Sequence, residues 1–179
     1  MFRTCSRVVL ICTLLLTVGV PGQSAAEASA ADGEGVLAWF DGQWIDLSEG
    51  WGGAAACSSD GVTATCYRSE AEMDRAARSS TTSMAIVPLA SCASSLRLYR
   101  STSYGGAVLQ LTTRGVYLNL SAYGFDNDTS SYKVGACASY FYDGANGGSP
   151  LYPGGTGANA SATSMLTGWD NRVSSVYIA

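Results

Sequence analysis

The chain carries the run Asp126-Asn127-Asp128-Thr129-Ser130-Ser131, and a second run, Asp170-Asn171-Arg172-Val173-Ser174-Ser175, follows the same pattern. Both read Asp-Asn-x-x-Ser-Ser. An aromatic residue, Phe125 or Trp169, precedes each run, and an alternating, strand-like tail follows it. The runs begin 44 positions apart. Four matched positions, repeated at this spacing, indicate an internal duplication.

The two runs are rich in oxygen donors. Carboxylates, amide carbonyls, hydroxyls and backbone carbonyls are the ligands that Ca2+ takes in proteins. The chain contains no histidine and no Cys-x-x-Cys pair, so a site for a softer metal is not expected. A single run of this kind is typical of an Asx-rich turn. Two runs in register favour a cation site in which the turn geometry is part of the structure.

The N-terminus has the features of a signal peptide. Arg3 and Arg7 precede an apolar stretch over residues 8–20, and small residues follow. Cleavage is expected after Ala30, with Ala26 as the alternative. The apolar stretch is shorter than the ~20 residues of a membrane-spanning helix. We therefore expect a secreted, extracellular protein with no membrane anchor.

Composition excludes several classes of function. With 21 glycines and 10 tyrosines among 179 residues and only 13% charged residues, the chain resembles β-rich extracellular proteins. The formal net charge is −4, and Lys133 is the single lysine beyond residue 30, so nucleic acid is not an expected partner. Without histidine there is no Ser-His-Asp or Cys-His arrangement, and we expect a non-enzymatic protein, most simply a monomer. Composition alone leaves a carboxylate pair for glycoside hydrolysis open.

Four cysteines follow the signal peptide, an even number that predicts two disulfides in an exported protein. Three pairings are possible. Cys57–Cys66 is favoured because the two residues flank Asp60-Gly61, a hairpin signal. Cys92–Cys137 is favoured as the second pair because each of these residues opens a repeat in a Cys-Ala-Ser context.

Residues 31–91 differ from the rest and are expected to form an N-terminal subdomain. Asp41-Gly42 predicts a tight turn between two short strands. Ser69 and Glu72 form a capping box that predicts a helix over 69–78. The acidic residues at the start of this helix are expected to be solvated.

From Cys92 onward the sequence contains two repeats, 92–136 and 137–179. In each copy a tyrosine precedes a glycine by six positions (99–105 and 142–148), and alternation of strand type follows. Propellers and solenoids need three or more such units. Two units of about four strands each favour a β-sandwich of two Greek keys.

The sequence resembles the βγ-crystallin superfamily in a pattern that occurs in each of two repeats. In this pattern an aromatic residue is followed by five residues and a glycine, and Asp-Asn-x-x-Ser-Ser comes later in the repeat. The resemblance is to secreted bacterial members, close to a crystallin-fold family of metalloprotease inhibitors, and covers 92–179. It implies a mainly β protein: a two-Greek-key βγ-crystallin-like β-sandwich, preceded by the small hairpin-plus-helix subdomain 31–91. Alternation is weak over 149–163, so the third strand of the second repeat is the least defined.

The resemblance also implies where calcium binds. In that superfamily each site draws on both motifs, so the two repeats are held together. The backbone carbonyl of the third residue and the hydroxyl of the first serine of each run are implied as ligands, and the remaining polar side chains either coordinate or hold the loop. The implied metal-site residues are Asp126, Asn127, Asp128, Ser130, Asp170, Asn171, Arg172 and Ser174.

The charges of the two runs differ. The first run has two carboxylates, whereas the second has one, with Arg172 close by. Few carboxylates among neutral donors predict weak sites, with dissociation constants on the order of 10⁻⁵ to 10⁻³ M.

Three functions compete. The first is a secreted Ca2+-binding protein whose two cation loops stabilise the fold. The alternative is a protease inhibitor that presents residues 143–157 or the 57–66 hairpin to an extracellular protease. A third is a carbohydrate or cell-wall binder, suggested by Trp39, Trp44 and Trp51, although packing in the core of the N-terminal part is the favoured role for these tryptophans.

Overall fold

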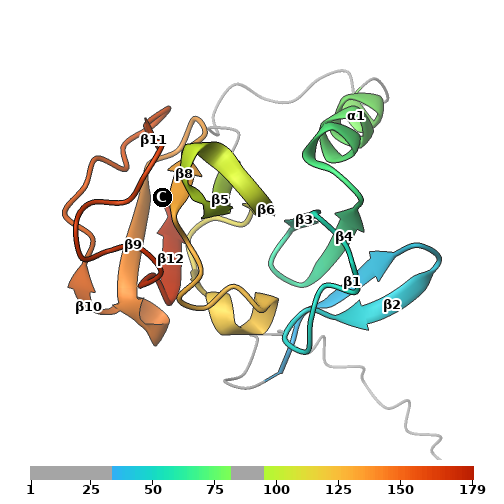
Figure 1. The fold of residues 1–179 in the computed structure, drawn as a ribbon, viewed down its shortest axis with the longest axis horizontal. Helices are drawn as coiled ribbons and strands as arrows, with labels where there is room; N and C mark the ends of the chain where they lie inside the picture. Colours follow the sequence, from blue (N-terminus) through green and yellow to red (C-terminus); the bar gives the residue numbers. More distant parts are fainter. Residues whose placement is uncertain (1–33, 82–94) are drawn as a thin grey trace, which may run out of the picture.

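The computed structural model describes residues 34–81 and 95–179. In these ranges the chain is mainly β, with twelve strands in two sheets and one α-helix. Figure 1 shows how these elements are arranged. The predicted signal peptide (1–30) and Cys92 lie outside the described residues. The predicted β-rich fold class is confirmed.

The elements follow one another in short pieces joined by turns. The N-terminal part holds β1 (Leu37–Phe40), β2 (Gln43–Asp46), β3 (Ala56–Ser59), β4 (Thr63–Tyr67) and α1 (Glu70–Thr81). The first repeat holds β5 (Leu96–Ser101), η1 (Thr102–Tyr104), β6 (Gly105–Leu111), β7 (Tyr117–Asn119), η2 (Leu120–Tyr123) and β8 (Ser131–Lys133). The second repeat holds β9 (Ser139–Gly144), η3 (Ala145–Gly147), β10 (Gly148–Leu151), β11 (Ser161–Ala162) and β12 (Ser175–Ile178).

The two repeats exchange one strand each. The first sheet has the order β11-β8-β5-β6-β3-β4-β1-β2, and the second has the order β10-β9-β12-β7. Strand β7 of the first repeat therefore lies in the sheet of the second, and β11 of the second repeat lies in the sheet of the first. The predicted sandwich of two Greek keys is confirmed, and the strand exchange, which was not predicted, links the two keys. The third strand of the second repeat, where alternation is weak, is the two-residue β11.

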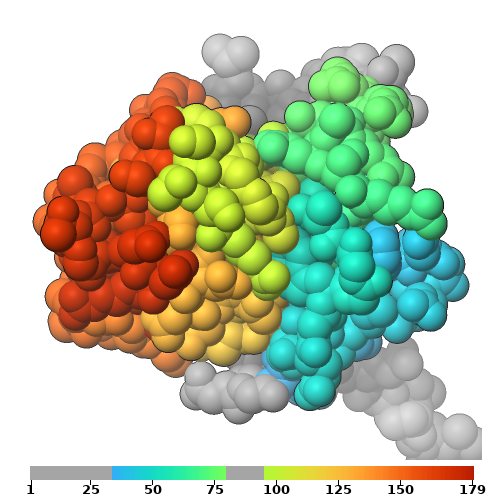
Figure 2. Space-filling view, viewed as in Figure 1, coloured from blue at the N-terminus to red at the C-terminus, as the bar shows by residue number. Residues whose placement is uncertain are grey.

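The N-terminal strands continue the first sheet. Strand β3 pairs in parallel with β6, from Ala56 opposite Val108 to Ser59 opposite Leu111. The sequence predicts the hairpins but not this pairing, because a parallel partner 52 positions away leaves no local signal. Figure 2 shows the N-terminal strands (cyan) packed directly against the first repeat (yellow).

Two tight hairpins shape the N-terminal part. Asp41 and Gly42 both have positive φ, 51° and 84°, as the predicted two-residue turn requires. In the second hairpin Cys57 lies opposite Cys66, and the predicted disulfide between them is confirmed.

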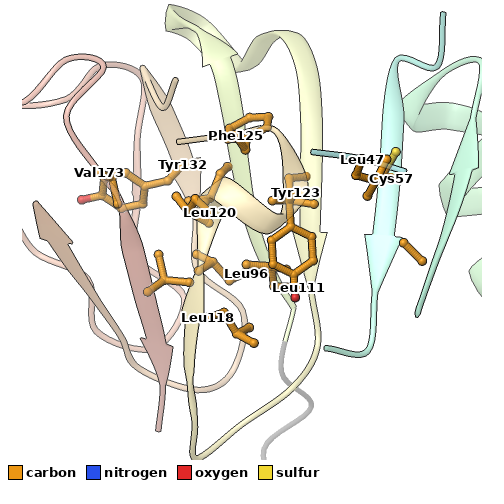
Figure 3. Packing of buried hydrophobic residues seen from close by; sticks show 14 of the residues in the cluster. Leu47, Cys57, Leu96, Leu111, Leu118, Leu120, Tyr123, Phe125, Tyr132 and Val173 are labelled. Atoms are coloured by element: carbon orange, nitrogen blue, oxygen red, sulfur yellow. The ribbon is translucent and has the colours of Figure 1, made fainter. Parts of the chain in front are cut away.

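One hydrophobic core runs through both parts of the molecule. Leu47 and Cys57 of the N-terminal part belong to the same buried cluster as Leu120, Tyr132 and other residues of the two repeats (Figure 3). Trp51 is also part of this core and is 7% exposed. The favoured role of core packing is thus confirmed for Trp51.

The prediction of core packing is wrong for the other two tryptophans. Trp39 and Trp44 are 42% and 59% exposed, and their rings contact each other edge to face on the outer face of the first hairpin. Residue type alone did not distinguish them from Trp51. Strand β1 alternates, and its inward positions are filled by Ala38 and Phe40, so Trp39 points outward beside Trp44.

Helix α1 lies over the outer face of the first sheet through Met73, which is 1% exposed. Ser69 caps the helix as predicted, because the Glu72 amide donates to Ser69 Oγ. The Glu72 carboxylate accepts from the amide of Arg68, one residue before the cap. The expectation of a solvated acidic start is wrong for Glu70, because its carboxylate accepts hydrogen bonds from Arg97 Nη1 and from the hydroxyl of Tyr99. Burial, together with this contact, raises the pKa of Tyr99.

Candidate cation-binding loops

Both Asp-Asn-x-x-Ser-Ser runs fold into the same turn. The second residue of each, Asn127 and Asn171, has a φ of 54°. This left-handed conformation is disfavoured for most side chains, but asparagine tolerates it. The two asparagines are therefore required by the backbone of the loops as well as by their chemistry.

The two loops face each other across the boundary between the repeats. The amide of Asn127 donates to the carbonyl of Val173 at 3.0 Å, and the amide of Asn171 donates to the carbonyl of Thr129 at 3.1 Å. These reciprocal hydrogen bonds lock each loop to its counterpart. Motifs that are 44 positions apart in sequence thus form one structural unit, as the resemblance implied.

Side chains repeat the reciprocal pattern. Ser130 Oγ donates to Asn171 Oδ1, and Ser174 Oγ donates to Asn127 Oδ1, each at 3.3 Å. The loops therefore create two small oxygen clusters, and each cluster has one oxygen from each repeat.

The final serine of each run belongs to the fold. Ser131 is fully buried, and its hydroxyl donates to the carbonyl of Ser101 at 2.6 Å and accepts from the amide of Tyr104 at 3.1 Å. It fastens the tight turn η1 onto β8. The carbonyl of Ser101 is thus engaged by this hydroxyl.

Ser175 has the same role in the second repeat. It is fully buried, donates to the carbonyl of Gly144 at 2.6 Å and accepts from the amide of Gly147 at 3.0 Å. The final serines therefore bind backbone rather than the oxygen clusters, and neither was among the predicted site residues.

Each loop carries an ion pair, and the two pairs have opposite orientation. Asp128 Oδ2 lies 2.7 Å from Arg100 Nε, and Arg172 Nε lies 2.7 Å from Asp143 Oδ2. Arg100 and Asp143 occupy equivalent places, directly after Tyr99 and Tyr142. The first repeat has its acid in the loop and its base on the strand, and the second repeat reverses this.

The sequence predicts that the two runs differ in charge, but the ion pairs remove this difference. Arg100 neutralises Asp128, and Asp143 neutralises Arg172. One carboxylate remains for each loop, that of Asp126 or Asp170 at the start of the run, and both of these residues are exposed. Each loop therefore has a formal charge of about −1 once its ion pair is counted, and the two loops are electrostatically alike.

Aromatic residues support the loops from below. Phe125 is fully buried, and its ring lies 5.7 Å from that of Trp51 and 5.2 Å from the guanidinium of Arg100. Trp169 is 7% exposed and lies 5.2 Å from the guanidinium of Arg172. An arginine thus covers the aromatic residue in both repeats, although it comes from the strand in one and from the loop in the other.

The donor set fits a hard cation. Asparagine carbonyl, serine hydroxyl, backbone carbonyl and an exposed carboxylate are all oxygen ligands. Two oxygens 3.3 Å apart can both lie within about 2.3–2.6 Å of one Ca2+ ion. Within 34–81 and 95–179, no three histidine, cysteine, aspartate or glutamate side chains gather.

All eight predicted residues lie in the paired loops. The structure brings four of them together in two contacting pairs, Ser130 with Asn171 and Ser174 with Asn127. Sequence reasoning missed the side-chain roles of Arg100 and Asp143. The available signal was that each follows the strand tyrosine of its repeat and is opposite in charge to the third residue of the following run.

No family model and no curated protein matches this chain. A βγ-crystallin from Ciona intestinalis is 22% identical over 48% of this chain and 99% of its own length, at a TM-score of 0.41. A βγ-crystallin from an archaeon (21%, covering 49% and 99%, TM-score 0.38) and Hahellin, a βγ-crystallin (23%, covering 48% and 91%, TM-score 0.37), are also similar.

The exchanged strands and the paired loops define the fold of this chain. The fold of the two repeats is similar to that of these βγ-crystallin domains. The crystallin-like part is extended by the N-terminal strands and helix, because strand β3 adds to the free edge of β6. Among the described residues, no helix is long and apolar enough to cross a membrane.

Proposed function

We propose that this protein is a secreted, non-enzymatic Ca2+-binding protein in which the facing loops hold calcium and stabilise the fold. The observation that carries the proposal is the reciprocal contact of Ser130 with Asn171 and of Ser174 with Asn127. Each pair places oxygens from both repeats side by side. Calcium bound there would link the two repeats.

Each loop would contribute the same kinds of ligand. The serine hydroxyls, the backbone carbonyls of Asp128 and Arg172 and the asparagine side chains would hold the ion, while the carboxylates of Asp126 and Asp170 supply the negative charge. Calcium supplies positive charge that draws these oxygens together. The chain's own part is to fix the loops beforehand through the four reciprocal hydrogen bonds.

Weak binding suits this arrangement. One net negative charge per loop and mostly neutral donors favour dissociation constants on the order of 10⁻⁵ to 10⁻³ M. At a calcium concentration ten times the dissociation constant, each site stabilises the folded state by about 1.4 kcal/mol. Two sites would give a visible rise in melting temperature.

Titration calorimetry and thermal unfolding test the proposal together. The wild type is expected to bind two Ca2+ ions and to melt at a higher temperature in millimolar calcium. Ser130→Ala and Ser174→Ala should each weaken binding about tenfold, while the calcium-free melting temperature falls by only a few degrees, the effect of losing one hydrogen bond. Ser121→Ala, an exposed serine in η2, is the control. Wild-type calcium binding by both loop variants would refute the assignment of these ligands.

Inhibition of an extracellular protease stays a prediction. Of the two candidate segments, the 57–66 hairpin has its cystine buried, with Cys57 0% and Cys66 6% exposed, and both of its strands are interior to the first sheet. Incubating the protein with thermolysin-like and subtilisin-like enzymes separates this alternative from calcium binding alone.

A further inference from the structure

One arginine connects the first cation loop to the N-terminal part of the molecule. Arg100 Nε lies 2.7 Å from Asp128 Oδ2 in the loop, and Arg100 Nη2 donates to the carbonyl of Gly124 at 2.8 Å. The same guanidinium lies 4.9 Å from the ring of Trp51 and 5.2 Å from that of Phe125. Arg100 therefore joins a carboxylate of the loop to an aromatic ring of the N-terminal part.

The N-terminal part is seated on the turn that leads into the first loop. Trp51 Nε1 donates to the carbonyl of Tyr123 at 2.8 Å, and the rings of Trp51 and Phe125 are 5.7 Å apart. The amide of Val36 donates to the carbonyl of Ala122 at 2.8 Å. These contacts fix the indole ring, and the indole ring in turn covers the guanidinium that holds the loop.

The second loop takes its corresponding support from its own repeat. Arg172 belongs to the loop itself and pairs with Asp143 on β9. Its guanidinium covers the ring of Trp169, which packs edge to face against Tyr152. The arginine that contacts the N-terminal part is thus the one that pairs with the first loop, and this asymmetry is not visible in the two matched runs.

The side chain of Asp128 restricts what its backbone can do. The backbone carbonyl of Asp128 is one of the proposed calcium ligands, while its carboxylate is held by Arg100. A guanidinium that Trp51 keeps in place limits the motion of this residue, so the loop has less conformational freedom to lose when an ion binds. Because binding free energies are linked reciprocally, an ion in the loop must also favour the packed position of Trp51.

We propose that the N-terminal part sets the calcium affinity of the first loop through Arg100, a positioning residue between Trp51 and Asp128. This inference rests on the proposed function of the loops and adds that one loop, not both, is under the control of the N-terminal part. Calcium in the first loop and the packing of Trp51 stabilise each other. The second loop binds calcium independently of the N-terminal part.

A double-mutant cycle on calcium affinity tests the connection. Arg100→Lys keeps the positive charge but not the planar fork, and Trp51→Phe keeps an aromatic ring in the core. Each variant should weaken calcium binding at the first loop about threefold, the size expected for partly exposed charges. The double variant should bind no more weakly than either single variant, because both changes break the same connection. Amide chemical-shift titration resolves the two loops, and the second should keep its wild-type affinity throughout.

Hydrogen exchange of the indole Nε1–H of Trp51 tests the reciprocal effect. In the wild type, saturating calcium should slow this exchange about threefold more than it slows the amides of β9 and β12, which report the overall stabilisation. Arg100→Lys should remove the additional slowing. Arg172→Lys is the matched control, because it changes the arginine of the second loop in the same way and should leave the additional slowing intact.

The outcomes separate this inference from the proposed function. If titration calorimetry detects no calcium binding by the wild type, both fail. If calcium binds but the losses in Trp51→Phe and Arg100→Lys multiply in the double variant, or if both loops weaken equally, the inference fails and the proposed function stands. An indole exchange rate in the wild type that follows β9 and β12 has the same meaning, and this measurement requires no variant. Thermal unfolding without calcium verifies that each variant is folded.

Discussion

The two cation loops have the same backbone and the same polar side chains, but they are supported differently. The first rests on the N-terminal part, because Trp51 packs against Phe125 and against the guanidinium of Arg100. The second rests on its own repeat, where Tyr152 packs against Trp169. A duplicated motif can thus keep its chemistry while its surroundings change, provided that each ion pair and each aromatic support is replaced by an equivalent.

This difference predicts that removing the N-terminal support affects one loop only. Trp51→Ala should lower the free energy of unfolding by about 3–5 kcal/mol, since a buried tryptophan is lost together with the hydrogen bond from its Nε1 to the carbonyl of Tyr123. Calcium binding at the first loop should weaken more than at the second. Urea unfolding and amide chemical-shift titration measure the two effects. Trp44→Ala, at an exposed site, should cost little, and equal losses in the two variants would contradict the support role of Trp51.

Two equivalent glycines offer a sharper comparison. Gly124 and Gly168 each precede the aromatic residue of their loop, and both have positive φ, 59° and 80°. A Cβ at Gly124 would lie 2.3 Å from the carbonyl oxygen of Leu47, whereas a Cβ at Gly168 would meet nothing within 4 Å. Only the first loop is pressed against the N-terminal part.

Gly124→Ala is therefore expected to cost about 2–4 kcal/mol, from left-handed strain plus overpacking. Gly168→Ala should cost about 1–2 kcal/mol, from the strain alone. Denaturant unfolding of both variants gives the comparison directly. Similar costs would mean that the N-terminal part is not held firmly against η2.

A third comparison concerns the fourth residue of each run. Val173 is fully buried, and so is Thr129 at the equivalent place, where the hydroxyl makes no hydrogen bond within the described residues. Thr129→Val should stabilise the protein by about 1 kcal/mol, because a buried, unpaired hydroxyl is removed. The reverse change, Val173→Thr, should destabilise by a similar amount. Calcium affinity should change in neither variant, and a loss of affinity in Thr129→Val would show that the hydroxyl belongs to the cation site.

Local sequence signals predicted much of this structure. The Asp41-Gly42 turn, the cap at Ser69 and the disulfide of the second hairpin each involve residues within about ten positions, and all three are confirmed. The pairing of the loops was implied by the family resemblance that the duplicated runs support, and the reciprocal hydrogen bonds between the loops agree with it. Ligand roles within the loops remain predictions, since geometry alone does not identify the ion.

Long-range packing could not be predicted from local sequence signals. Nothing in the pattern of β3 indicates that it pairs with β6, and nothing in residue type separates buried Trp51 from exposed Trp39. Counting charges along each run also failed to predict the net charge of the loops. The ion-pair partners Arg100 and Asp143 come from strands about 28 positions upstream of the residues they neutralise. Pairing across the fold, rather than composition, sets the charge of each loop.

The smallest expected effect tests this charge balance. Asp128→Asn and Asp143→Asn each leave an arginine uncompensated and change the charge of one loop from about −1 to zero. Calcium affinity at that loop should fall about two- to fivefold, the size expected for partly exposed charges, and the other loop should be unaffected. Glu49→Gln, exposed and outside both loops, is the control. The opposite result is a strong loss of calcium affinity in Asp128→Asn with no loss in Asp143→Asn. It would mean that only the charges within each run matter, and that the ion pair of Asp143 with Arg172 does not tune the second site.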